Sequence, residues 1–269
     1  VTFVVVFLTA PLLVVLMASF NRERYLDFPV EDYSTQWYSD LVTDSQWRNA
    51  VDNSLLIGLA SATLAVLIAL PLAYAVHSYR PRLTPALFAL GVLPFMLPPV
   101  ISAVGMLVFW NRVGHVGKVE NVVVAHGVFF STIPLITITL GLQSIDAAVG
   151  EAATTLGATP RQRFRTVTLP LLLPSIVTGF VAALVLSLNE YIIAFMVAGF
   201  SVETLPIKIF NSLRYGFTPT IAAVSVVFTL LSVVALGVLA RPGGLERLLG
   251  TDLSDRCAGC PRCGRRGPE

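Results

Sequence analysis

Several long runs of apolar residues restrict the fold of this chain more than any other feature of its sequence. A helix of about twenty apolar residues is long enough to cross the hydrocarbon core of a bilayer. A helix also satisfies its own backbone polar groups, which have no water to bind at that depth. The runs therefore predict an all-α membrane protein. We expect six spans, at about residues 1–20, 54–76, 85–109, 121–142, 171–198 and 219–240.

The composition agrees with a membrane protein and excludes other classes. Charged residues make up 13% of the 269 residues, whereas a soluble domain carries about 25%. The net charge is only +2, and no basic patch alternates with stacking aromatic residues, so we expect no nucleic-acid partner. All three cysteines lie in the C-terminal tail. The lipid bilayer and helix packing, rather than disulfides, must therefore stabilise the main body.

The segments between the spans indicate the side of the membrane that each one faces. Residues 21–53 are rich in acidic and aromatic residues, and we place this loop outside the cytoplasm. Residues 77–84 carry two arginines, which favours the cytoplasmic side. For residues 1–20 a cleaved signal peptide is the alternative interpretation. We expect kinks in span 85–109, at its prolines Pro94, Pro98 and Pro99.

The polar segment 143–170 has the pattern of two short helices joined at a corner. Asp146 is a suitable N-cap for a helix over residues 147–156, because its carboxylate can accept from the free amides of the first turn. Gly157 fits the left-handed position just past the end of that helix. A second helix then begins with a capping box and a proline at its first position, formed by Thr159, Pro160 and Gln162.

This segment resembles the EAA loop of permeases in binding-protein-dependent ABC importers. The shared residues are Glu151-Ala152-Ala153, Gly157 and Val167-Thr168-Leu169-Pro170, with Val167 where the family has isoleucine. The resemblance implies the fold of a type I ABC importer permease, with six transmembrane helices and a cytoplasmic coupling loop. It implies that these residues couple to an ATPase: Glu151, Ala152, Ala153, Gly157, Arg161, Arg165, Leu169 and Pro170. An ordinary surface hairpin between two spans is the alternative.

The same resemblance implies how the chain is powered and what it assembles with. The sequence has no Gly-x-x-x-x-Gly-Lys-[Ser/Thr] loop, so we expect a transport subunit and not an enzyme, with no cofactor of its own. ATP and Mg would bind to a dimer of partner ATPase subunits. The other implied partners are a second, related permease subunit and an external substrate-binding protein. The expected location is the inner membrane, as a multi-pass protein with both termini in the cytoplasm.

A carboxylate interrupts the fifth predicted span. One helix face is predicted by residues at spacings of three or four, namely Gly179, Ala183, Ser187, Glu190, Ala194 and Ala198. A charged group in a span is costly and usually functional. We therefore place a candidate substrate path at Ser187, Asn189, Glu190 and Tyr191. The alternative for Glu190 is a structural partner for an arginine or a backbone group. For His126 near the end of the fourth span, we expect a hydrogen-bonded packing histidine, with a residue of the substrate path as the alternative.

The run from Ser187 through Val227 is similar to the second permease of spermidine/putrescine importers, most clearly in LNEYIIAFMVAG. This similarity implies polyamine transport, with Glu190 and Tyr191 offering a transient site for a cation. Ferric-iron and thiamine permeases share parts of the run, so import of one of these or of another small solute is the alternative. A self-contained secondary transporter is a further alternative, but the sequence shows no clear internal repeat.

Residues 241–269 follow the permease domain of residues 1–240 and predict a disordered cytoplasmic tail rich in Gly, Arg and Pro. The tail contains a C-x2-C-x2-C run, formed by Cys257, Cys260 and Cys263. A ferredoxin-type site would need a fourth cysteine where Gly267 stands, and no histidine is nearby to complete a zinc site. We expect no metal here. A membrane anchor with a metal-binding tail is the alternative.

Overall fold

The computed structural model describes residues 2–23, 30, 32–78, 84–215 and 219–239. Over these residues the chain is helical, with one isolated bridge between Asn21 and Tyr33. The predicted tail and its cysteines lie outside the described residues. The helices in chain order are α1 (Thr2–Ala18), α2 (Gln36–Thr43), α3 (Ser45–Ser78), α4 (Thr84–Met96), α5 (Pro99–Val113), α6 (Val119–Phe130), α7 (Thr132–Ser144), α8 (Ala147–Thr155), α9 (Pro160–Arg163), the π-helix η1 (Phe164–Thr168), α10 (Leu169–Asn189), α11 (Ile192–Ala198), α12 (Leu205–Tyr215) and α13 (Pro219–Leu239).

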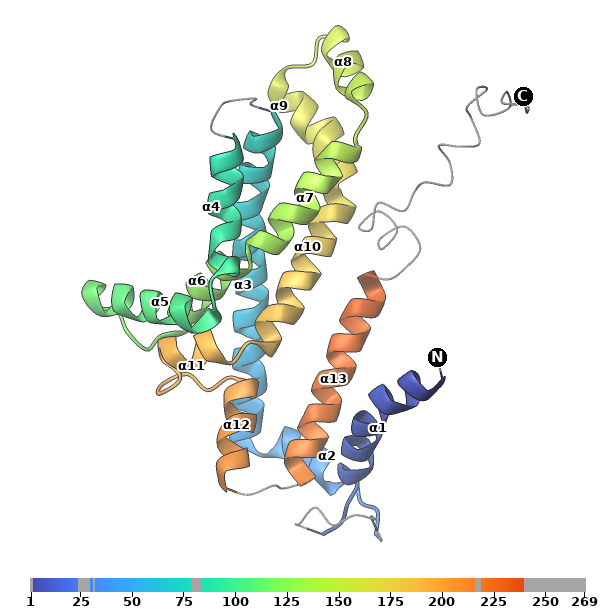
Figure 1. The fold of residues 1–269 in the computed structure, drawn as a ribbon, viewed down its shortest axis with the longest axis vertical. Helices are drawn as coiled ribbons and strands as arrows, with labels where there is room; N and C mark the ends of the chain where they lie inside the picture. The colour runs from blue at the N-terminus through green and yellow to red at the C-terminus, as the bar shows by residue number, and fades with distance from the viewer. Residues whose placement is uncertain (1, 24–29, 31, 79–83, 216–218, 240–269) are drawn as a thin grey trace, which may run out of the picture.

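The central helix is α3, against which α6, α7 and α10 pack (Figure 1). It has 34 residues, which at about 1.5 Å per residue gives a length of about 50 Å. Its small residues recur at spacings of three or four and are fully buried, namely Ala62, Ala65, Ala69 and Ala73. Small side chains let the backbones of neighbouring helices approach closely. The core of the bundle therefore lies along this face of α3.

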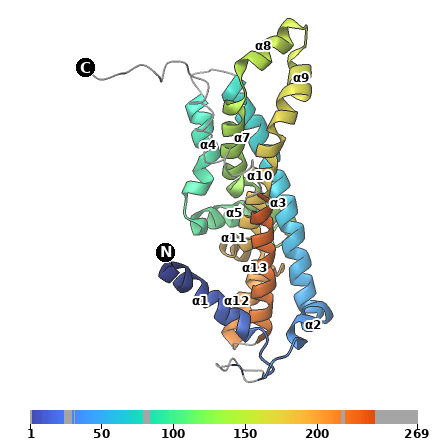
Figure 2. The same ribbon diagram turned by 90° about the vertical axis from the view of Figure 1, so that its right-hand side faces the viewer.

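The two ends of the bundle are built from different elements. The helices α8 and α9 form one end, whereas α2 and α12 lie at the other (Figures 1 and 2). At this second end the backbone N–H of Leu205 donates to Ser54 Oγ at 2.7 Å, and Asn53 Nδ2 donates to the carbonyl of Glu203 at 3.0 Å. These bonds attach the start of α12 to α3.

The segment 21–53, which we expected to be a loop with interfacial aromatic residues, is largely folded into the bundle. Residues from Gln36 onward form α2 and the first turns of α3. Both of its tryptophans are buried. The indole N–H of Trp37 donates to the carbonyl of Asn21 at 2.5 Å, and Trp47 packs in a cluster with Leu205. The expectation of a loop is wrong for this part because these rings pack inside the protein.

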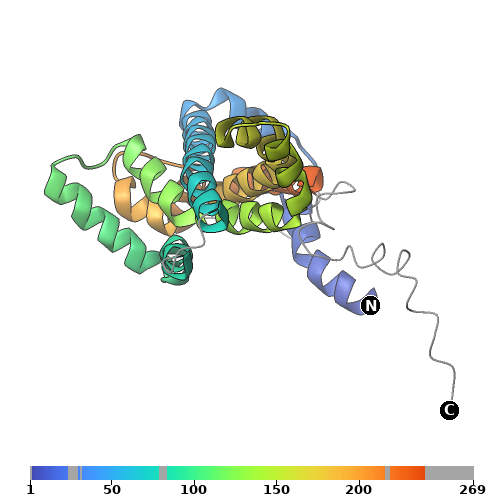
Figure 3. The ribbon, with the colours of Figure 1, turned by 90° about the horizontal axis from the view of Figure 1, so that it is seen from above.

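The third predicted span is not one continuous helix. Leu97 and Pro98 separate α4 from α5, and the two helices meet at 100°. Neither Pro98 nor Pro99 has an N–H with which to continue the helical hydrogen bonds. Consequently α5 runs across the bundle and projects sideways from it (Figure 3). The kink expected at Pro98 and Pro99 is confirmed, whereas α4 continues through Pro94 without a break.

The fifth predicted span is also broken. The helix α10 ends at Asn189, Glu190 has an extended backbone, and α11 begins at Ile192. The small residues of the predicted face are buried on both sides of the break. They lie on two helices, so the prediction of one helix face across Glu190 is wrong. The helix is broken here because the side chain of Glu190 accepts hydrogen bonds from the first turn of α11.

The number of spans remains a prediction. Among the described residues, Ser45–His77 and Pro160–Asn189 are long and apolar enough to cross a membrane. Each of the bent pairs α4–α5 and α6–α7 adds one more if the pair counts as a single span. The shorter apolar stretches Thr9–Ala18 and Pro219–Ala235 lie in α1 and α13.

The contact between α7 and α10 gives a first prediction. A Cβ atom at Gly179 would lie 2.7 Å from the backbone Cα of Pro134, which cannot move aside as a side chain would. We expect Gly179→Leu to lower the melting temperature of the purified protein in detergent, because overpacking of a tight core costs about 1–3 kcal/mol or more. Gly105→Leu is the control, since nothing lies within 4 Å of its Cβ position. Equal melting temperatures for the two variants would contradict this packing.

Candidate functional site

The end of the bundle formed by α8, α9 and η1, here called the corner, contains the segment that resembles an EAA loop. Asp146 caps α8 by accepting from the N–H of Ala148 at 2.9 Å. Gly157 has φ +80°, and its N–H donates to the carbonyl of Thr154 at 2.9 Å while that of Ala158 donates to Ala153 at 3.0 Å. These are the two bonds of a Schellman motif. The predicted cap and the predicted glycine stop are both confirmed.

The second half of the corner begins at the predicted capping box. Thr159 Oγ1 accepts from the N–H of Gln162 at 3.3 Å, and Gln162 Oε1 accepts from the N–H of Thr159 at 2.9 Å. Pro160 occupies the first helical position, where its missing N–H costs nothing. The caps therefore fix the angle between α8 and α9 through local bonds.

A π-helix that the sequence analysis missed joins the corner to the bundle. Residues Phe164–Thr168 form η1, which runs directly into α10. The ring of Phe164 meets the ring of Tyr74 on α3 edge-on, at a centroid distance of 4.8 Å. Single π-turns are rare and occur frequently at functional sites. Since Pro160–Asn189 is one continuous helical stretch, the corner is connected to the middle of the bundle without a flexible joint.

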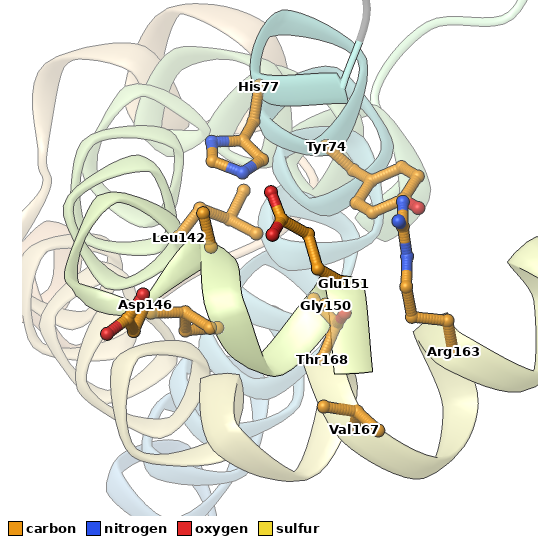
Figure 4. A pocket seen from close by; sticks show the side chains of 11 residues that line it. Tyr74, His77, Leu142, Asp146, Gly150, Glu151, Arg163, Val167 and Thr168 are labelled. Atoms are coloured by element: carbon orange, nitrogen blue, oxygen red, sulfur yellow. The ribbon is translucent and has the colours of Figure 1, made fainter. Parts of the chain in front are cut away.

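A pocket of about 280 Å³ lies between the corner and the ends of α3 and α7. Its lining includes charged and polar side chains from four elements, namely His77, Asp146, Glu151, Arg163 and Thr168. Figure 4 shows Glu151 pointing from α8 into this pocket, toward His77. In the described part of the chain, no hydrogen bond or ion pair is formed by the Glu151 carboxylate. The pocket therefore holds a carboxylate that is available for a further partner.

The residues expected to couple to an ATPase lie at the corner or directly after it. Glu151, Ala152 and Ala153 lie on α8 and Gly157 on the turn, while Arg161 and Arg165 are exposed on α9 and η1 and Leu169 and Pro170 begin α10. Sequence reasoning missed Leu156, whose side chain is 87% exposed beside Gly157. A large exposed apolar side chain is suited to contact with another protein. Its position at a helix C-cap was the available signal.

The four residues expected on a substrate path fall into two groups. Ser187 and Glu190 face His126 on α6: His126 Nδ1 lies 2.8 Å from Ser187 Oγ, and His126 Nε2 lies 3.1 Å from Glu190 Oε2. The expectation that His126 is a hydrogen-bonded packing residue is thereby confirmed. The structural alternative for Glu190 agrees with its bonds to the backbone of α11.

Asn189 and Tyr191 instead line a cavity of about 330 Å³ between α10, α12 and α13. The wall of the cavity is mostly aromatic and aliphatic, with Pro206, Ile209, Phe210, Leu213 and Phe228. The rings of Tyr191 and Phe210 are 4.6 Å apart. The faces of such rings carry negative charge density and attract cations.

The chain matches a known protein family and several known proteins. The family described as "Binding-protein-dependent transport system inner membrane component" matches residues 64–241. The chain is 29% identical to the spermidine/putrescine transport system permease protein PotC of Escherichia coli (strain K12), over 87% of this chain and 88% of that protein. It is 31% identical to the putrescine transport system permease protein PotI of the same organism, over 81% and 80%.

A third relative carries a different name. The putative 2-aminoethylphosphonate transport system permease protein PhnV of Salmonella paratyphi A (strain ATCC 9150 / SARB42) is 29% identical, over 88% of this chain and 89% of that protein.

Solved structures have the same fold. A bacterial ABC transporter involved in the import of the acidic polysaccharide alginate aligns with a TM-score of 0.69 at 16% identity, over 90% of this chain and 93% of that chain. The MetNI methionine ABC transporter, in inward-facing conformations, aligns with a TM-score of 0.62 at 22% identity, over 76% and 95%. At these identities the likeness concerns the fold alone.

The capping box gives a second prediction. Thr159→Ala removes the acceptor for the N–H of Gln162, and loss of such a cap costs about 1 kcal/mol, or about a fivefold faster exchange of the amides it protects. Hydrogen exchange followed by mass spectrometry should show this increase in peptides that cover α9. Thr166→Ala is the control, because Thr166 Oγ1 bonds only the carbonyl of Gln162 within the helix. Unchanged exchange in Thr159→Ala would show that the box does not hold the corner.

Proposed function

The chain belongs to the family of inner-membrane components of binding-protein-dependent transport systems, and on that premise we propose that it is the permease subunit of an ATP-driven importer of polyamines. The identity of the cargo is inferred from the similarity to PotC and PotI, which extends over at least four fifths of each chain. Both names refer to putrescine, and one also to spermidine. The aromatic cavity at Asn189 and Tyr191 supports a flexible, positively charged cargo, because aromatic faces attract ammonium groups.

The energy for transport comes, in this proposal, from a separate ATPase dimer that docks at the corner. Leu156 offers an apolar contact, and Arg161 and Arg165 offer charged ones. The caps of α8 and α9 keep the corner rigid, so a displacement by the ATPase reaches η1 and α10 without being lost in a loop. The sequence has no Gly-x-x-x-x-Gly-Lys-[Ser/Thr] loop, so in this proposal Mg and ATP bind to the partner.

Alternating access follows if the partners favour different states of the bundle. A ligand shifts a conformational equilibrium only by its difference in affinity for the two states. The closed ATPase dimer would favour the outward-facing state of this subunit and of a second permease subunit, and the loaded external binding protein would dock to that state. The corner then faces the cytoplasm, as do both termini, and α12 faces the outer side, with six spans between them.

The cargo path in this proposal passes the break between α10 and α11. Asn189 and Tyr191 line the cavity beside the break, whereas Ser187 and Glu190 contact His126 next to it. We expect a cation to move along the ring faces of Tyr191 and Phe210. A cation–π contact contributes only about 0.5–2 kcal/mol, which is enough to guide a cargo and too little to retain it.

A second candidate cargo follows from the relative PhnV, whose printed name refers to 2-aminoethylphosphonate. That solute also carries an amino group, so the ring faces would suit it equally well. The phosphonate distinguishes the two cargoes, and competition experiments can separate them.

The proposed cargo can be tested directly. The subunit is reconstituted into liposomes with its partner subunits and binding protein, and uptake of labelled spermidine is measured with and without ATP. We expect ATP-dependent uptake that unlabelled putrescine reduces and 2-aminoethylphosphonate does not. Uptake driven by an ion gradient without the ATPase would contradict the proposal, and inhibition by the phosphonate alone would favour the second cargo.

The proposed role of the corner gives a further prediction. Gly157→Asp places a side chain at φ +80° and a charge on the docking surface, and we expect it to reduce ATP-dependent uptake about tenfold or more, because loss of this contact removes the drive itself. Membrane abundance should be unchanged. The control is Gly114→Asp, which has φ +74° and open space around its Cβ position but lies at the end of α5. Normal uptake in Gly157→Asp would remove the coupling role.

A further inference from the structure

The break between α10 and α11 leaves backbone amides without helical partners in an apolar part of the protein. Glu190 has φ −83° and ψ 127°, so the helical hydrogen bonds stop at this residue. The first amides of α11 then have no carbonyl one turn earlier to bind. In a bilayer no water is available to replace it. The break can therefore persist only if some other group accepts these bonds.

The side chain of Glu190 is that group. The N–H of Ile193 donates to both carboxylate oxygens at 2.9 Å, and the N–H of Ala194 donates to Oε2 at 3.0 Å. The carboxylate thus replaces the missing turn of helix. Its side chain is only 9% exposed, and a carboxylate that is buried to this extent requires a further donor.

His126 on α6 is that further donor. Its side chain is 1% exposed, and its Nε2 lies 3.1 Å from Glu190 Oε2. A carboxylate that already accepts from two amides can only accept again, so Nε2 carries the proton and donates. In a neutral ring, Nδ1 is then left as an acceptor, and the hydroxyl of Ser187, 2.8 Å away, donates to it. The three side chains connect α6, the last turn of α10 and the first turn of α11.

We propose that His126 is a positioning residue, which acts through Glu190 to fix the break and thereby to present Asn189 and Tyr191 to the cavity between α10, α12 and α13. The inference rests on the proposed function for the use of that cavity. Asn189 and Tyr191 flank Glu190 in the sequence and line the cavity, so any rotation of Glu190 moves both of them. The bond between His126 Nε2 and the Glu190 carboxylate joins the residue at the break to α6.

Two amide variants of His126 separate this bond from the other bonds of the ring. The side-chain nitrogen of glutamine can reach the position of Nε2, whereas that of asparagine reaches only the position of Nδ1. We expect His126→Gln to retain the donor to Glu190 and His126→Asn to lose it. Loss of a buried hydrogen bond to a charged group corresponds to about a tenfold effect or more.

The first measurement needs no cargo. Asn189→Cys is introduced into the assembled transporter with Cys257, Cys260 and Cys263 changed to serine, and the rate of maleimide labelling is measured. We expect His126→Asn to change this rate at least about threefold, as the freed break moves position 189, and His126→Gln to leave it near the starting value. Asn111→Cys, exposed at the end of α5, is the control and should label equally in all variants. An unchanged rate at position 189 in His126→Asn would overturn the inference.

The second measurement tests whether the hydrogen bond between His126 and Glu190 also matters for transport. The maximal rate of spermidine uptake should fall about tenfold in His126→Asn and be restored in His126→Gln, while both variants stay folded and assembled with their partner subunits. Equal losses in both variants would show that the Nε2 bond is not the relevant one. If the unmodified transporter takes up no spermidine, the proposed function fails, but the labelling comparison still decides the role of His126.

Discussion

Every backbone N–H in the apolar part of this protein needs a partner, and the architecture depends on how the helix breaks meet that requirement. Between α4 and α5 the break lies at Pro98 and Pro99, which have no N–H, and the N–H of Ile101 donates to the carbonyl of Pro98 at 2.9 Å. At Ser131 the N–H donates to the carbonyl of Val128 at 3.4 Å. At Glu190 a carboxylate replaces a whole turn. The position of α5, the bend between α6 and α7 and the cavity beside α11 all follow from these three solutions.

The parts of the fold that could be predicted from the sequence are those held by local bonds. Asp146, Gly157 and the box at Thr159 act on residues within a few positions, so their types and spacing are sufficient to place them. The breaks could not be located in the same way. Glu190 terminates α10 because a histidine 64 positions earlier accompanies it, and no local pattern contains that information. The π-helix has no sequence signal of its own, and the burial of Trp47 depends on α12, which follows it by more than 150 residues.

Of the candidate site, the corner could be predicted from the sequence, whereas the arrangement of the path residues could not. The corner residues were identified as a group because they are contiguous in the chain. The path residues were chosen for their polarity within a span, and this criterion does not separate a side chain that bonds the backbone from one that lines a cavity. Only the packing of α6 and α12 against the break makes that division. The continuous stretch Pro160–Asn189 connects the two regions, so a displacement at the corner arrives at the break as a displacement of Asn189.

The wide turn of η1 also determines how the chain length between corner and bundle can vary in evolution. The N–H of Leu169 donates to the carbonyl of Phe164, so this turn contains one residue more than an α-turn. A deletion of one residue here can be absorbed by a return to α-geometry, and α9 and α10 then keep their orientation relative to each other. An insertion has no such outlet, and it would rotate the corner by about 100° around the axis of α10. Homologous chains should accordingly tolerate shortening at this point and select against lengthening.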